Sequence, residues 1–137
     1  MTCGIEVPRR AHEQLRLGLM TAGSRMLAAD GDADFREAHA ALAAFCASEL
    51  VPHLEADERW LVRAGSCPEA RLLATAMRAE ARALTAAVGE LAAATDPCGA
   101  AAAARVVHAL LSAHINHTGL LAEAIGPAGN RPRQRSV

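Results

Sequence analysis

The stretch His53-Leu54-Glu55-Ala56-Asp57-Glu58-Arg59-Trp60-Leu61 places an imidazole four residues before a carboxylate. On an α-helix these two side chains stand one turn apart on the same face, so both can point into a core. Histidine and aspartate pointing into a helix bundle are a natural pair of metal ligands. Glu58 adds a second carboxylate that a small rotation could bring in. The competing interpretation is a surface histidine with two solvated acids, because Asp and Glu are mostly exposed.

The composition favours a core made of helices. Hydrophobic residues make up 52% of the 137 residues, whereas aromatic residues make up 2% and tyrosine is absent. A core of Ala, Leu, Val and Met suits closely spaced helices better than strands. The length is that of one domain with a substantial core. We therefore expect a single all-α domain over residues 1–127, followed by a polar, disordered tail over residues 128–137.

Charge and terminal pattern argue against several classes of partner. The formal net charge of −1 provides no bulk attraction for nucleic acid or anionic lipid. Charged residues or histidines interrupt every apolar run, so no membrane-spanning segment is expected. The sequence begins Met1-Thr2-Cys3-Gly4-Ile5-Glu6, which lacks the basic and apolar regions of a secretory signal. We expect a cytoplasmic protein that binds neither nucleic acid nor membrane.

The four cysteines show no CxxC spacing. A reducing compartment would keep them as thiols, and nothing in their spacing argues for a disulfide. Cys46 lies in the middle of a predicted helix, where it is expected to act as a small core residue.

Turn signals divide the chain into four amphipathic segments. Apolar residues recur at alternating spacings of three and four within each segment, which predicts helices over residues 9–29, 35–62, 69–94 and 100–125. Pro52 lies inside the second helix and should kink it just before His53. Four helices of this length with short turns predict an up-down-up-down four-helix bundle.

Ionisable residues interrupt the apolar faces of all four helices. Burying such a group without a partner costs several kcal/mol, so these residues need partners in the core. Adjacent antiparallel helices place the start of the first beside the end of the second, where His12 and His53 can meet. His39 lies about 21 Å along the helix from His53 and belongs elsewhere, and His108 falls outside the interior face. The residues on the predicted interior faces are His12, His39, His53, Asp57, Glu80, His114 and His117.

The arrangement resembles the hemerythrin-like HHE cation-binding domain family over residues 8–126. The resemblance depends on His12 early in the first helix, on Pro52-His53 followed by acidic residues late in the second, and on a histidine in the fourth. It implies a four-helix bundle of the kind that typically holds two non-haem irons and binds oxygen or nitric oxide. Proteins of this family act in sensing, storage or repair of iron centres.

The family's site is pseudo-symmetric, and the two halves of this chain differ. The first half keeps all three expected ligands, whereas Ala81 and Thr118 stand where the second half should offer a histidine and a carboxylate. The resemblance therefore implies a reduced, mononuclear site. Three imidazoles and one carboxylate suit iron or zinc, with iron the first choice. The expected ligands are His12, His53, Asp57 and His114, and the candidate additional ligands are Glu58, Glu80 and His117.

Other functions remain open at this point. The chain could be a metal-free helical interaction module that packs against a partner or a second copy as a homodimer. Two facing histidines could also ligate haem, because imidazole serves haem iron as well. A non-haem iron could bind a small gas such as O2 or NO, or carry out oxidative chemistry. The sequence displays no nucleophile or substrate pocket, so enzymatic activity is left undecided.

Overall fold

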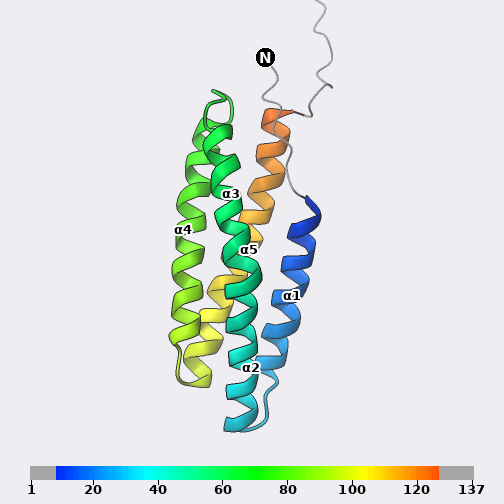
Figure 1. Ribbon diagram of the computed structural model, residues 1–137, viewed down its shortest axis with the longest axis vertical. Coiled ribbons are helices and arrows are strands. Elements are labelled where there is room, and N and C mark those ends of the chain that lie inside the picture. The colour runs from blue at the N-terminus through cyan, green and yellow to red at the C-terminus, as the bar shows by residue number, and fades with distance from the viewer. Residues whose placement is uncertain (1–8, 127–137) are drawn as a thin grey trace, which may run out of the picture.

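The computed structural model describes residues 9–126, which form helices joined by short turns (Figure 1). The helices lie alongside one another, and α2, η1 and α3 follow each other without a break, so the chain has four long helical rods. The predicted all-α class with four helices is confirmed. The predicted tail lies outside the described residues. The elements are α1 (Arg9–Leu27), α2 (Asp32–Phe45), η1 (Cys46–Leu50), α3 (Val51–Ala64), α4 (Arg71–Ala93) and α5 (Pro97–Ile125).

Most helix ends differ from the predicted ends by two or three residues, and capping explains two of these differences. The last helix begins at Pro97. Asp96 caps it by accepting a hydrogen bond from the Gly99 N–H at 2.8 Å, and the missing N–H of Pro97 is tolerated because first-turn N–H groups have no acceptor within the helix. The second begins at Asp32, directly after Gly31. Gly31 has φ of 87°, a value that favours glycine.

The irregularity at Pro52 takes the form of a π-helix. Proline has no N–H to donate, and its ring crowds the carbonyl group four residues earlier. The five residues of η1 lie just before it, and the Val51 N–H bonds the Cys46 carbonyl across this wider turn. Such π-bulges occur frequently at functional sites. The helix thus continues through Pro52 into α3, which carries His53 and Asp57.

The apolar core confirms the predicted helices but rotates two of them. The apolar periodicity predicts that the core contains Leu15, Leu19, Leu42, Leu73, Leu84, Leu110 and Leu121, and all but two of these are buried. Leu73 and Leu110 are only partly buried, and the neighbouring Ala74 and Leu111 are buried in their place. The buried face of α5 has a regular 4-3-4-3-4 spacing, formed by Val107, Leu111, His114, Thr118, Leu121 and Ile125.

Cysteine usage matches the expectation in part. Cys46 is fully buried, and burial raises the pKa of its thiol to about 11, so it stays protonated as a small core residue. Cys98 is an exposed free thiol. Cys67 is buried and takes part in a disulfide, which the expectation of four thiols did not foresee.

One helix has the length and composition of a membrane span, although the sequence was expected to contain none. An 18-residue window of α5 has a mean hydropathy of 1.3, and 22% of that window is buried. Core helices of soluble proteins and signal sequences meet the same criterion. The criterion therefore decides nothing about a membrane.

Gly18 lies at a close contact between α1 and the second rod. A Cβ at this position would lie 2.5 Å from the Phe45 ring. Alanine is favoured over glycine in a helix by about 1 kcal/mol, whereas overpacking costs about 1–3 kcal/mol. Because the ring is stiff, we expect Gly18→Ala to lower the free energy of unfolding, measured by urea denaturation. Gly89→Ala, with nothing within 4 Å of its new Cβ, should instead stabilise the protein. A stabilising Gly18→Ala would mean that Phe45 yields freely.

Candidate metal centre

Three of the four rods contribute to one buried group of polar side chains. His12 comes from α1, His53 and Asp57 come from successive turns of α3, and His114 comes from α5. The residues His12, Asp57 and His114 are at most 3% exposed. The His53 side chain, at 11%, is the most accessible of the four. The structure therefore brings together all four residues that the sequence predicted as ligands.

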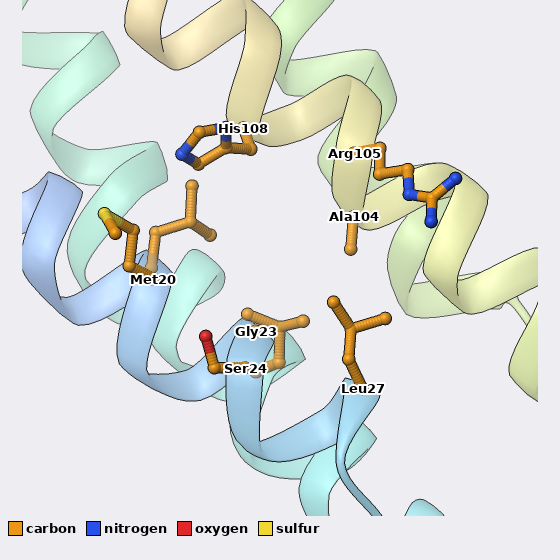
Figure 2. Close-up of a pocket in the computed structure, with 9 residues that line it drawn as sticks. Met20, Gly23, Ser24, Leu27, Ala104, Arg105 and His108 are labelled. Atoms are coloured by element: carbon orange, nitrogen blue, oxygen red, sulfur yellow. The ribbon is translucent and has the colours of Figure 1, made fainter.

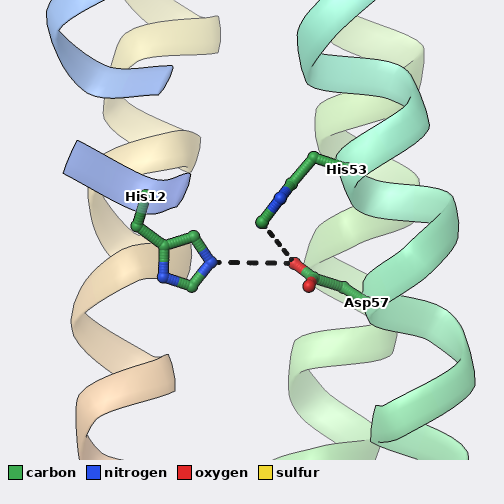
Figure 3. Close-up of side chains that lie close together, drawn as sticks. All are labelled: His12, His53 and Asp57. Carbon is green, nitrogen blue, oxygen red and sulfur yellow. Dashed lines mark ion pairs between the residues drawn. The ribbon is translucent and has the colours of Figure 1, made fainter. Parts of the chain in front are cut away.

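The three imidazoles surround one carboxylate oxygen, Asp57 Oδ2. It lies 2.8 Å from Nε2 of His114, 3.1 Å from Nε2 of His53 and 4.0 Å from Nε2 of His12. Figure 3 shows His12 pointing at Asp57 from the opposite helix, while His53 approaches Asp57 from the same helix, α3. The other carboxylate oxygen, Oδ1, accepts a hydrogen bond from the Trp60 indole N–H at 2.8 Å. One oxygen is thus held by the indole while the other faces the histidines.

The surroundings keep Asp57 ionised. Burial alone would raise the pKa of its carboxyl group, because the charged form loses hydration. Neighbouring imidazole and indole groups outweigh burial and hold this pKa well below its usual range. In order of effect these groups belong to His114, His12, His53 and Trp60. The cluster therefore contains a buried anion, which favours a cation at its centre.

Three buried ring nitrogens of the cluster have no hydrogen-bond partner among the described residues. They are Nε2 of His12, Nε2 of His53 and Nδ1 of His114. A buried polar atom without a partner costs about 1–3 kcal/mol, so three in one place need an explanation. The His12 and His53 rings are only 4.7 Å apart between centroids. One ligand atom each from His12, His53 and Asp57 lie within 4.8 Å of one another, and this group could hold a metal ion.

His114 faces a carboxylate on each side of its ring. Nε2 lies 2.8 Å from Asp57, and Nδ1 lies 3.5 Å from Oε1 of Glu80 on α4. A neutral imidazole has one N–H and can donate to only one of them. Here Nε2 hydrogen-bonds Asp57, whereas Nδ1 makes no hydrogen bond, so a metal at Nε2 would require the proton to sit on Nδ1, on the side of Glu80. The contact with Glu80 thus matches the carboxylate–histidine arrangement common beside metal ions.

The candidate additional ligands have other partners. Glu58 pairs with Arg78 at 2.6 Å on the half-exposed side of α3, and the hydrogen bond from Arg78 lowers the pKa of its carboxyl group. Glu80 lies at the edge of the cluster, where its Oε2 is 3.0 Å from Nδ1 of the half-exposed His117. Glu58 is therefore placed apart from the cluster, while Glu80 and His117 form a second pair beside it.

Two histidines lie away from the centre, as expected. Nε2 of His39 is 2.7 Å from the Leu91 carbonyl oxygen, and its ring stacks on Phe35. His108 is exposed.

The second half of the site offers no anionic ligand in the core. Ala81 and Thr118 are both buried. The Thr118 hydroxyl donates to the His114 carbonyl within its own helix, at 2.9 Å. Neither side chain can neutralise a second cation.

Trp60 is a partner of the site that the sequence analysis did not identify. Its indole N–H is the donor that fixes the Asp57 carboxylate. The signal that could have revealed it is the i,i+3 spacing of Asp57 and Trp60, because a buried tryptophan usually pairs its N–H.

Two pockets open along the groove between α1 and α5. The smaller, about 320 Å³, is lined by His12, Glu13, Ile115, Thr118, Gly119 and Glu123, so it reaches the cluster. The larger, about 470 Å³, is mainly apolar and has Met20, Leu27 and His108 among its lining residues (Figure 2). None of the four clustered residues lines the larger pocket.

Comparison with known proteins provides no relative. Neither the protein-family models, nor the curated proteins, nor the solved structures contain a match to this chain.

Proposed function

We propose that this chain is a hemerythrin-like non-haem iron protein that binds a small gas such as O2 or NO at a mononuclear centre. The observation that carries the proposal is the convergence of three imidazoles on one buried, ionised carboxylate, with ring nitrogens left unpaired. A cation would pair with Nε2 of His12 and Nε2 of His53 and would neutralise Asp57 at once. The proposed ligands are His12, His53, Asp57 and His114.

The proposed architecture is an up-down-up-down bundle. Short turns separate the rods, and rods that follow each other in the chain lie next to each other in Figure 1. Antiparallel neighbours of this kind need only such short connections. The arrangement accounts for the meeting of His12, early in α1, with His53, late in the second rod.

The ligand chemistry supports iron first and zinc second. Two histidines and one carboxylate are the ligand type of mononuclear non-haem iron sites, and a third histidine is compatible with either metal. The pocket beside His12 and Thr118 leaves space for a small exogenous ligand next to the cluster. An iron with open coordination positions would supply reversible gas binding there.

The protein's own residues orient the ligands. Trp60 fixes one oxygen of Asp57, so that the other points at the histidines. Glu80 lies 3.5 Å from Nδ1 of His114, where its carboxylate would stabilise a proton on Nδ1 once Nε2 binds a metal. Both contacts restrict the rotation of a ligand before the cation arrives, which reduces the entropic cost of binding.

Haem ligation gains no support from the ring geometry. The His12 and His53 rings meet edge to face at 75°, with a carboxylate oxygen beside both. Haem would need a flat slot between two axial imidazoles, and this packing provides no such slot.

A metal-free interaction module is the alternative function. Large apolar side chains are exposed along α1 and α5, where a partner or a second copy could cover them. In that case the histidines would only hydrogen-bond to Asp57. The exposed residues on these two helices are Leu17, Met20, Leu27, Val106 and Leu120.

Elemental analysis separates the two functions. We expect untagged protein from iron-supplemented cells to contain about one iron per chain, because Ala81 and Thr118 remove one side of a two-metal site. His53→Ala should lose the metal, and His39→Ala, a matched change in the same rod, should keep it. Two metals per chain would contradict the mononuclear site and direct attention to Glu80 and His117. Protein that is purified without metal and does not bind added iron or zinc would contradict the metal centre and favour the interaction module.

A further inference from the structure

A buried metal centre needs a route to solvent. His12, Asp57 and His114 are almost completely inaccessible. The pocket of about 320 Å³ between α1 and α5 has His12 and Thr118 as its buried lining residues, and its other lining residues are exposed or half-buried. His12 presents Nε2 as a buried nitrogen without a hydrogen-bond partner. The pocket thus leads from the surface to the side chain of one proposed ligand, whose Nε2 faces Asp57 on the inner side.

The charge at this pocket favours cations. Two exposed carboxylates line it, Glu13 from α1 and Glu123 from α5, and no Lys or Arg lines it. Arg16 pairs with Glu13 at 3.1 Å, which offsets part of its charge. Glu123 has no ion pair among residues 9–126. Acidic groups around a recessed opening raise the local concentration of cations and their rate of association.

Gly119 lines the same pocket. A Cβ built on Gly119 would meet nothing within 4 Å, so the glycine faces open space. Its φ is not positive, and therefore its backbone does not need glycine. Glycine inside a helix costs about 1 kcal/mol relative to alanine. Gly89 shares these properties, but Gly119 lines the pocket, so a larger side chain at Gly119 would occupy space there.

We propose that this pocket is the route by which a divalent cation reaches His12 and the centre behind it. In this role Glu13 and Glu123 attract the cation, and Gly119 leaves the passage wide enough. The inference rests on the proposed metal centre, but it is independent of which metal or gas the centre binds. It concerns rates, because the route is not part of the ligand set.

A variant without the two acidic side chains tests whether the pocket attracts cations. Cobalt(II) would be mixed with apo protein, and uptake followed by its visible absorption. We expect the double variant Glu13→Gln/Glu123→Gln to take up cobalt about three to ten times more slowly at low ionic strength, with stoichiometry unchanged. The difference should vanish near ~0.5 M salt, where such fields are screened. Glu90→Gln, which removes an exposed acid from α4, should leave the rate unchanged.

A variant with a large side chain at position 119 tests whether the metal ion moves through this pocket. Gly119→Leu should slow both uptake and chelator-driven release of cobalt at least about tenfold, with the same final occupancy. Gly89→Leu is the matched control, because Gly89 is also a helical glycine facing open space. Circular dichroism checks folding, and if Gly119→Leu is unfolded, the double variant decides alone. Unchanged rates in the folded variants would overturn the route. Failure of the unmodified protein to bind cobalt would instead overturn the proposed centre.

Discussion

Asp57→Asn should lower the affinity of the centre for metal by at least about 100-fold while leaving the helices intact. Asp57 Oδ2 is the carboxylate oxygen around which the three imidazoles are arranged. The amide removes the negative charge and the anionic ligand, yet it has nearly the same volume and can still accept from Trp60. Removing one partner from a buried charge pair costs about 3–5 kcal/mol, more than a 100-fold change requires. Competition with a chelator would measure the affinity, and far-ultraviolet circular dichroism the fold.

Glu58→Gln is the matched control for this change. Glu58 is the next residue in α3, but it pairs with Arg78 away from the cluster. The same loss of one negative charge should therefore leave metal affinity nearly unchanged. Equal losses in both variants would show that the general negative charge of α3 matters and not a ligand. Metal binding preserved in Asp57→Asn would place the centre elsewhere in the bundle.

The helices could be predicted because their apolar periodicity is regular, but their rotation about their own axes could not be fixed this way. On α5, Leu110 and Leu111 are neighbours, so faces built on either residue fit the same period. Packing selected Leu111, and with it Thr118 in place of His117. His114 belongs to both faces, which is why it was placed correctly.

The core of the cluster was accessible to sequence reasoning because spacing alone fixes His53 against Asp57 on one helix face. Contacts between helices required the structure, because the approach of Glu80 to His114 depends on the rotation of α4. Within α3, the pairing of Trp60 with Asp57 also depends on side-chain torsions. The π-helix before Pro52 was also hidden, because a proline inside a helix permits several local solutions.

Leu84→Ala should lower the free energy of unfolding by about 2–5 kcal/mol. Leu84 is 0% exposed and belongs to the same buried cluster as Leu54 and Leu111, which come from the helices that carry the centre. Truncation removes apolar contacts and leaves a cavity that rigid helices can fill only in part. Urea denaturation would measure the loss as a lower midpoint with an unchanged slope.

Leu72→Ala provides the control, because Leu72 lies on the same helix and is 85% exposed. Its truncation should change the free energy of unfolding by no more than about 0.5 kcal/mol. Leu84 follows Glu80 by four residues, so both lie on one face of α4. A rotation of α4 that exposed Leu84 would also carry Glu80 away from His114. Equal stabilities of the two variants would therefore contradict the core packing and the orienting role of Glu80 together.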